Sequence, residues 1–185
     1  MEKDLLKLAK ERRSTRQISD EPVSDETIQK ILDIAAYAPS SWGRRPVEFI
    51  VVRDRKTMME LARCKAMGAG PLAFGAAAIV PIIDKRELEL WVEDAAVAST
   101  YILLAAEYYG VGACWIHMKD RRGHTNMAED DIRALLGIPE YYGILNAVSL
   151  GMKKKPSEER ELQPKVHHKK YSDALSKVSV IDLTR

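Results

Sequence analysis

The stretch from Glu11 to Gln17 reads ERRSTRQ and gathers three arginines, one serine and one threonine near the start of the chain. An arginine guanidinium offers a rigid fork of N–H donors that suits phosphate and carboxylate groups, and hydroxyls complete such a site. The pattern therefore predicts an anion-binding site. The alternative is an ordinary solvated helix end, because basic residues near a helix C-terminus complement the helix dipole.

A second polar stretch, PSSWGRRP, covers residues 39–46 and supplies two serines, a glycine and two more arginines. Prolines at both ends and a glycine in the middle are typical of a loop. Such a loop can present backbone and side-chain donors to a ligand, whereas the simpler alternative is a surface turn.

Cysteine and histidine are placed unfavourably for catalysis or metal binding. Cys64 and Cys114 are the two cysteines, and their distance in sequence favours a reducing, cytoplasmic compartment over a disulfide framework. Cys114 and His117 are expected on one strand, where an offset of three residues places them on opposite faces. No spacing matches a zinc motif, and neither a Gly-x-Ser-x-Gly elbow nor a phosphate-binding glycine loop occurs. We expect no metal, and we expect Cys114 to be a small buried core residue.

Composition limits the class of protein. The 185 residues are 46% hydrophobic and 30% charged, which suits one domain with a real core. The 29 basic and 27 acidic residues leave a net charge of +2, which is too balanced for a protein that coats nucleic acid. The charged N-terminus differs from a signal peptide, and no apolar stretch is long enough to span a bilayer. We expect a cytoplasmic protein that binds neither nucleic acid nor membrane.

Hydrophobic periodicity predicts five helices. The first should place Leu5, Leu6 and Leu8 toward the core, and the second should begin after an N-cap at Ser24 and end before Pro39. The expected ranges are 4–13, 25–38, 56–64, 89–109 and 128–136.

β-branched and apolar runs predict strands, and Pro81 inside one of them indicates a strand end or a sheet edge. The expected strands are 48–53, 76–83, 112–118 and 144–150. Helices and strands alternate irregularly, which favours an α+β fold with one sheet flanked by helices over a doubly wound dinucleotide-binding fold.

The segment from Ala95 to Ala106 contains no charged residue. A helix that is apolar on nearly every face must be buried on nearly every side, which one small domain can hardly achieve. We therefore predict that a second subunit covers part of it. Residues 1–152 should form the domain, and the polar residues 153–185 should form an arm or tail that packs on the partner subunit.

Four segments, taken in order, resemble the nitroreductase family of FMN-dependent flavoproteins. They are ERRSTRQIS, similar to the family's Arg-Arg-Ser-x-Arg-x-Phe opening, ILDIAAYAPSSWGRRPVEFIVVRD, DAAVASTYILLAAEYYGVGACWIH and LLGIPEYYGILNAVSLGM. The resemblance covers about Leu5 to Tyr171. It implies an α+β fold with a central mixed or antiparallel sheet flanked by helices. It also implies an intertwined homodimer with two FMN sites at the interface, each lined by both chains.

The resemblance further implies which residues meet FMN. Arg12 and Ser14 would lie near the phosphate and ribityl chain, and Arg16 near the pyrimidine edge of the ring, where a guanidinium raises the reduction potential. The other matched positions are Arg13 in the same stretch, Ser40, Ser41 and Arg45 in a loop from the partner subunit, Trp115, Ile116 and His117 along one flavin face, and Lys165 or Lys169 near the phosphate.

The implied activity is that of an FMN-dependent oxidoreductase. NADH or NADPH would reduce FMN, which would then reduce a nitroaromatic, quinone or related acceptor by a ping-pong mechanism. No catalytic residue is named, because the cofactor supplies the chemistry. Gly43, Arg45 and Val47 replace the asparagine, glutamine and tryptophan usual in the family, and the arginines of this loop could receive an acidic substrate or the phosphates of a nicotinamide cofactor.

Three alternatives stay open. The chain could bind FMN without turnover, as a sensor or store. It could carry out specialised flavin chemistry such as dehydrogenation or dehalogenation. It could also be a binding module without a cofactor, driven by the basic runs at residues 153–155 and 166–170.

Overall fold

The computed structural model describes residues 4–86, 88–156, 158 and 160–167 of the chain. Lys169 and the rest of the predicted arm beyond residue 167 lie outside the described residues.

The described chain forms one six-stranded sheet in which every strand pair is antiparallel. Strands follow the order β1–β6–β3–β2, with β4 paired to β6 and β5 paired to β3. The strands are β1 Ile18–Ser19, β2 Glu48–Val52, β3 Ala77–Asp84, β4 Val111–His117, β5 Tyr142–Ile144 and β6 Asn146–Lys153. The helices are α1 Leu5–Glu11, α2 Asp25–Ala36, the 3₁₀ turn η1 Ser41–Gly43, α3 Arg55–Arg63, α4 Gly70–Phe74, α5 Trp91–Tyr108 and α6 Ala128–Leu136.

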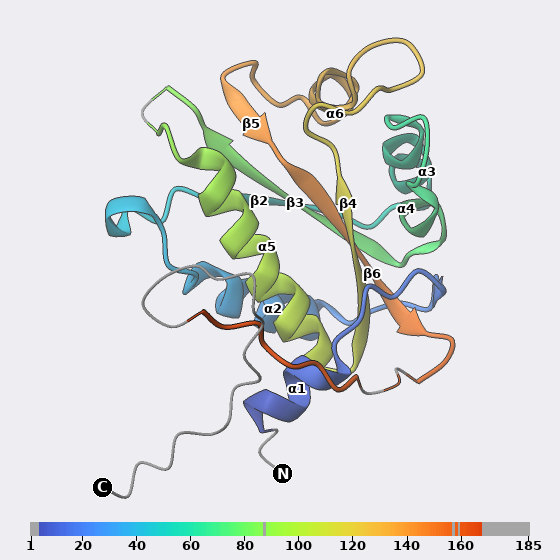
Figure 1. Ribbon diagram of the computed structural model, residues 1–185. Coiled ribbons are helices and arrows are strands. Elements are labelled where there is room, and N and C mark those ends of the chain that lie inside the picture. The colour runs from blue at the N-terminus through green and yellow to red at the C-terminus, as the bar shows by residue number, and fades with distance from the viewer. Residues whose placement is uncertain (1–3, 87, 157, 159, 168–185) are drawn as a thin grey trace, which may run out of the picture.

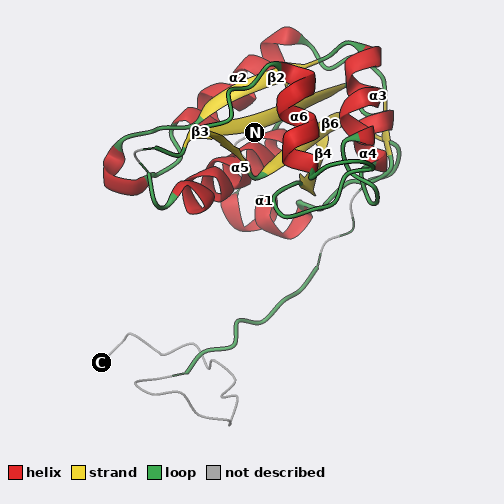
Figure 2. Ribbon diagram, turned by 90° about the horizontal axis from the view of Figure 1, so that it is seen from above, coloured by secondary structure: helices red, strands yellow, loops and turns green. Residues whose placement is uncertain are grey.

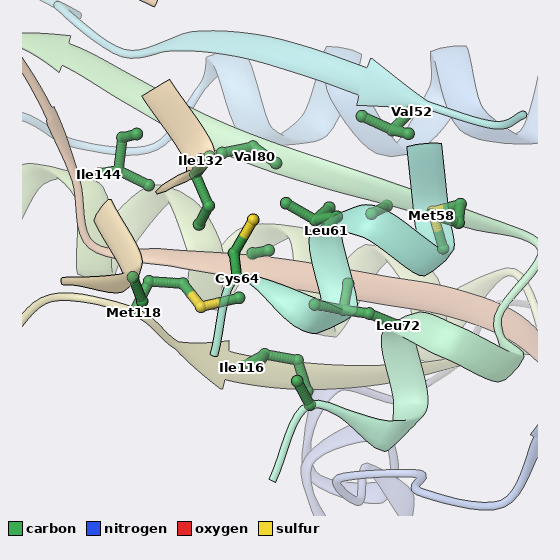
Figure 3. Close-up of a cluster of buried hydrophobic side chains, with 14 of the residues drawn as sticks. Val52, Met58, Leu61, Cys64, Leu72, Val80, Ile116, Met118, Ile132 and Ile144 are labelled. Atoms are coloured by element: carbon green, nitrogen blue, oxygen red, sulfur yellow. The ribbon is translucent and has the colours of Figure 1, made fainter. Parts of the chain in front are cut away.

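Helices cover both faces of the sheet, as the sequence predicts (Figure 1). One core joins α3, α4 and α6 to the sheet, and Figure 3 shows Ile116 of β4 and the following residue Met118 reaching into it, with Met118 beside Cys64. A second core joins α2 and α5 to the opposite face. The alternation of side chains along β4 therefore sends neighbouring residues into different layers.

Several helix ends match the sequence prediction and its physical reason. Ser24 caps α2, because its Oγ accepts a hydrogen bond of 3.2 Å from the backbone N–H of Thr27. Helix α6 ends at Gly137, whose φ of 66° suits a residue without a Cβ. The prediction for α1 is wrong in part: Leu8 is buried, but Leu5 and Leu6 are 71% and 62% exposed. This seven-residue helix lies at the rim of the domain, so only one side of it meets the core.

Strand prediction fails at two connected places. Pro81 lies inside β3, which is an interior strand and not an edge. The predicted strand 144–150 is two strands, β5 and β6, and β3 pairs with β6 through Ile79 and with β5 from Ile82 onward. Pro81 falls where β3 changes partner, so its missing N–H costs no ladder hydrogen bond there.

Helix α5 is covered on one side only. Its buried face includes Ala98, Ile102 and Ala106, whereas Leu103 and Leu104 are half-buried. Apolar surface therefore remains on this helix, and its burial by a second subunit stays a prediction. Among the described residues, no helix combines the length and apolar character needed to cross a membrane.

Candidate functional site

The arginine-rich stretch lies against the first half of β4. The backbone N–H of Thr15 donates to the carbonyl of Ala113 at 2.8 Å, and Ser14 forms an isolated parallel bridge with the same residue. Gly112 permits this approach, since a Cβ there would lie 3.0 Å from Thr15 Cγ2 and 2.9 Å from Ile18 Cγ2. The backbone between Arg12 and Arg16 is thereby fixed at the edge of the sheet.

Beyond Thr15 the outer edge of β4 is open. Because Ala113 directs its carbonyl outward, the alternate residues Trp115 and His117 direct their backbone groups to the same edge. No strand of the described chain pairs with that edge. An open strand edge presents a row of N–H donors and C=O acceptors, which a flat heterocycle with alternating acceptors and donors can match.

Unpaired cations flank this edge. Within the described residues, neither the half-buried Arg12 nor the exposed Arg16 has an ion-pair or hydrogen-bond partner for its guanidinium. Burial raises the pKa of Cys114 on β4, and the positive charges of Arg16 and Lys65 oppose that rise. Arg16 and Lys65 are therefore both close enough to β4 for their positive charges to act on Cys114.

Arg13 differs from its neighbours. Its guanidinium donates to the carbonyl of Arg12 at 2.6 Å and to the carbonyl of Glu158 at 2.8 Å. Lys10 and Glu161 form an ion pair at 2.6 Å nearby. Lys10 and Arg13 thus hold the start of the C-terminal arm against α1 and the residues that follow it, and two of the five N–H donors of Arg13 are in use.

Trp115 and His117 share one face of β4 and are half-buried. Their rings stack with centroids 6.4 Å apart and an angle of 10° between planes. Ile116 points to the other face, where it is 2% exposed, and its backbone groups face β6, so neither its side chain nor its backbone meets the open edge. Burial, followed by the nearby charges of Arg121 and Lys65, lowers the pKa of His117, which favours a neutral imidazole at pH 7.

The loop from Ser40 to Arg45 is not brought to the Arg12–Arg16 segment. Its 3₁₀ turn projects at the left of Figure 1, whereas the N-terminal stretch lies at the lower right. Ser40 Oγ accepts from the backbone N–H of Arg45 at 2.7 Å and keeps its own proton to donate. Ser41 donates both its N–H and its O–H to Asp94 Oδ1, at 2.8 and 2.9 Å. Of the two serines, only Ser40 therefore keeps a side-chain donor for a ligand.

Lys165 is exposed on the described part of the arm, which leads away from the sheet (Figure 2). It does not meet Arg12 or Arg16 of its own chain in this arrangement. Lys169, the other matched lysine, lies outside the described residues.

The described part of the chain contains neither a reactive cysteine nor a cluster of metal ligands. Cys64 and Cys114 are free and buried. Burial raises the pKa of Cys64 to about 11 and raises that of Cys114 as well, which suppresses the reactive thiolate. Nowhere in the described residues do three histidine, cysteine, aspartate or glutamate side chains gather as metal ligands.

Three further residues of the site escape sequence reasoning. Lys65 and Arg121 act electrostatically on His117, although they come from two separate loops. The only signal for Lys65 is its place just after a predicted helix and before the small residues of AMGAG. Asp94, which anchors Ser41, carries no signal beyond being an acidic residue at the start of an apolar helix.

The model of the Nitroreductase family matches residues 9–80 and 65–152 of the chain. The chain belongs to the nitroreductase family.

Relatives of this nitroreductase-family chain cover most of its length. A protein of Archaeoglobus fulgidus with the provisional name NADH dehydrogenase/NAD(P)H nitroreductase is 38% identical over 162 residues, 85% of this chain and 88% of its own. An FMN-dependent nitroreductase of Clostridium difficile has a solved structure with a TM-score of 0.81 and 36% identity, covering 85% of this chain and 92% of that one. A protein of Desulfovibrio desulfuricans, provisionally described as a nitroreductase and solved in complex with FMN, gives a TM-score of 0.69 and 26% identity over 88% of this chain and 94% of that one.

Proposed function

We propose that this chain is an FMN-dependent oxidoreductase that uses NADH or NADPH as its hydride donor. The observation that carries the proposal is the pair of partnerless guanidinium groups, Arg12 and Arg16, fixed beside the open edge of β4. Bound FMN would supply the redox chemistry, since it accepts a hydride from a nicotinamide and passes electrons to an acceptor. Family membership and the FMN-bound relative support the choice of cofactor.

The donor set fits FMN. Arg12 and Ser14 would hold the phosphate, whose dianion matches a guanidinium and a hydroxyl. Arg16 would lie at the pyrimidine edge, where its charge favours the reduced anionic ring. The backbone groups of Trp115 and His117 offer the ring alternating donors and acceptors along the open edge.

The second half of the site would come from a partner subunit in a homodimer. Ser40 offers a hydroxyl proton, but its loop lies away from the Arg12–Arg16 segment of the same chain (Figure 1). A second copy could supply that loop and could also cover the apolar surface left on α5. The arm beyond residue 153, with Lys165, would pack on the partner in the same assembly.

The acceptor would be a flat aromatic molecule such as a nitroaromatic or a quinone. Beside Lys65 lies a hollow of about 390 Å³ lined in part by Met59, Met67 and Phe74. Met67 and Phe74 are 82% and 60% exposed, which is unusual for side chains that favour contact with aromatic rings. An opening shared by donor and acceptor would make them bind in turn, as in a ping-pong mechanism.

The test begins with the visible spectrum of the purified protein, followed by anaerobic titration with NADH and with NADPH. We expect bound FMN that a nicotinamide bleaches and that menadione or a nitrofuran then reoxidises. Bound FMN that neither nicotinamide reduces would favour a flavin store or sensor. A colourless protein that does not bind added FMN would overturn the proposal.

A further inference from the structure

Asp94 is a buried carboxylate with no cationic partner in the described chain. It lies in the first turn of α5 and is 4% exposed. Its Oδ1 accepts two hydrogen bonds from Ser41, from the backbone N–H at 2.8 Å and from the hydroxyl at 2.9 Å. The positive end of the α5 dipole stabilises a negative charge at this position. Asp94 therefore accepts two hydrogen bonds from Ser41, a residue of the loop from Ser40 to Arg45.

That loop needs an anchor because its backbone is strained. Trp42, Gly43 and Arg45 have φ values of 57°, 68° and 50°, and two of them carry side chains. A residue with a Cβ costs on the order of 1–3 kcal/mol in this region and stays there only when its surroundings impose it. Trp42 is 90% exposed, so core packing does not impose the shape. The Ser40–Arg45 and Ser41–Asp94 hydrogen bonds do.

The second oxygen of Asp94 shows that the carboxylate is not there for an ion pair. Oδ2 is buried and has no hydrogen-bond partner in the described chain. Asp94 and Arg45 both line a hollow of about 220 Å³. Arg45 nevertheless directs its guanidinium over the ring of Tyr37, 5.9 Å from the centroid. Burying Oδ2 without a hydrogen-bond partner destabilises the fold. We therefore attribute the presence of Asp94 here to the two hydrogen bonds that its Oδ1 accepts from Ser41.

We propose that Asp94 is the positioning residue that holds the loop of one subunit in the shape required by the flavin of the other. This rests on the proposed function. Asp94 keeps Ser41 turned inward, and Ser40 then presents its hydroxyl outward from a rigid turn. Asp94 begins the third segment of the family resemblance, but its role is visible only through its contact with Ser41, 53 residues away.

The anchor can be tested without flavin. Asp94→Ala removes both acceptors, whereas Asp94→Asn keeps an oxygen in the place of Oδ1. Losing two hydrogen bonds to a charged group should increase loop opening about tenfold or more. In the folded apoprotein, we expect trypsin to cleave the Arg44–Arg45 bond about tenfold faster or more in Asp94→Ala than in the wild type. In Asp94→Asn the cleavage rate should stay within about threefold of the wild-type rate. The matched control is Glu93→Ala, which changes an exposed acidic residue of the same turn. Trypsin should cleave this variant at the wild-type rate. Equal rates for Asp94→Ala and the control would overturn the anchor.

The action across subunits needs a mixed dimer, purified with two different tags. One protomer carries Asp94→Ala and the other carries Arg16→Ala. If each loop serves the partner's site, both lesions fall in one site, the other site is intact, and the dimer retains one tightly bound FMN. If each loop serves its own chain, both sites are damaged and no FMN is retained tightly.

The outcomes separate the two proposals. If the wild-type protein binds no FMN, the proposed function is wrong, and so is the role of Asp94 toward flavin. The trypsin result would still show whether Asp94 anchors the loop. An unchanged protein that binds FMN, together with a mixed dimer that retains none, leaves the proposed function intact and overturns the action of Asp94 across subunits. Retention of two FMN by homodimeric Asp94→Ala would show that flavin binding does not depend on this residue.

Discussion

The Arg12–Arg16 segment and the Ser40–Arg45 loop look alike in sequence and differ in structure. Each combines arginines with two hydroxyl residues. In the first, the backbone is fixed by β4 while the guanidinium groups of Arg12 and Arg16 have no partner in the described chain. In the second, the backbone is strained and its hydrogen bonds are made internally, to Ser40 and to Asp94.

This difference indicates two different tasks. A fixed backbone with unpaired charges is suited to receive an anion, because the ligand supplies the missing partners at no cost in reorganisation. A strained loop with satisfied donors is suited to hold one shape and to present few groups, of which Ser40 is the clearest. The variants below test whether ligand binding depends on charge in the first region and on shape in the second.

The largest effect is expected at Arg16. Replacement by alanine removes a charge that would pair with the anionic flavin, and charge-assisted hydrogen bonds are worth about 1.5–3 kcal/mol. We expect Arg16→Ala to weaken FMN binding by about tenfold or more and to make the midpoint potential more negative. A fluorescence titration and an anaerobic spectroscopic titration measure these quantities. Arg55→Ala, an exposed arginine at the start of α3, is the control. If both quantities match the control, Arg16 does not belong to the site.

Substitutions of the two serines should distinguish Ser40, the expected hydrogen-bond donor to FMN, from Ser41, which anchors the loop to Asp94. Ser40→Ala removes the free hydroxyl proton and should weaken FMN binding by about fivefold, the value of one ordinary hydrogen bond. Ser41→Ala keeps the backbone bond to Asp94 and loses only the hydroxyl bond. It should act mainly by increasing trypsin cleavage after Arg44, with a smaller change in FMN affinity. The reverse ranking of the two affinities would contradict our assignment of roles.

Arg13 offers a comparison within the first region. Two of its N–H donors bind the carbonyls of Arg12 and Glu158, which holds its guanidinium on the arm and away from a ligand. Arg13→Ala should leave FMN affinity within about twofold, since no hydrogen bond to the ligand is lost, and should speed proteolysis of the arm after Lys153. Limited proteolysis followed by mass spectrometry, together with an FMN titration, measures both. A loss of affinity as large as that of Arg16→Ala would show that Arg13 turns toward the ligand when FMN binds.

Sequence reasoning identified elements well where the cause is local. The range of α6 follows from periodicity and from Gly137, and the α2 cap follows from Ser24. The sequence also identifies both arginine-containing stretches as candidate ligand-binding segments, because residue types can be counted without knowing the fold. It could not distinguish Arg13 from Arg16, since the partner that occupies Arg13 is 145 residues away.

Long-range pairing also explains the failed predictions. Pro81 was expected at an edge because a proline breaks a ladder, yet the ladder on that side changes strand at this residue. Leu5 and Leu6 were expected in the core because they are apolar, yet α1 lies at the rim. In both cases the outcome depends on which segment lies alongside, and periodicity does not contain that information.

The smallest effect expected is a pH dependence at His117. Burial and the neighbouring cations Arg121 and Lys65 lower its pKa in the folded protein, whereas Asp120 opposes this and Lys119 adds to it. An unfolded histidine titrates near 6.5. Below that pH the unfolded chain binds a proton that folded His117 resists, so this residue makes the apoprotein less stable as pH falls through about 6.5 and contributes nothing above it. His117→Gln should therefore flatten the decline of the melting temperature between about pH 7.5 and 5.5.

FMN should reverse the sign of this dependence. Its phosphate and ring bring negative charge to the cations that depress the pKa of His117, so the pKa should rise in the complex and binding should take up a proton. FMN affinity should then increase slightly as pH falls toward 6, and His117→Gln should remove the increase. Calorimetric titrations in two buffers of different ionisation enthalpy measure the proton uptake directly. Uptake that persists unchanged in His117→Gln would assign it to another group, and would separate the aromatic face of β4 from the charged segment beside it.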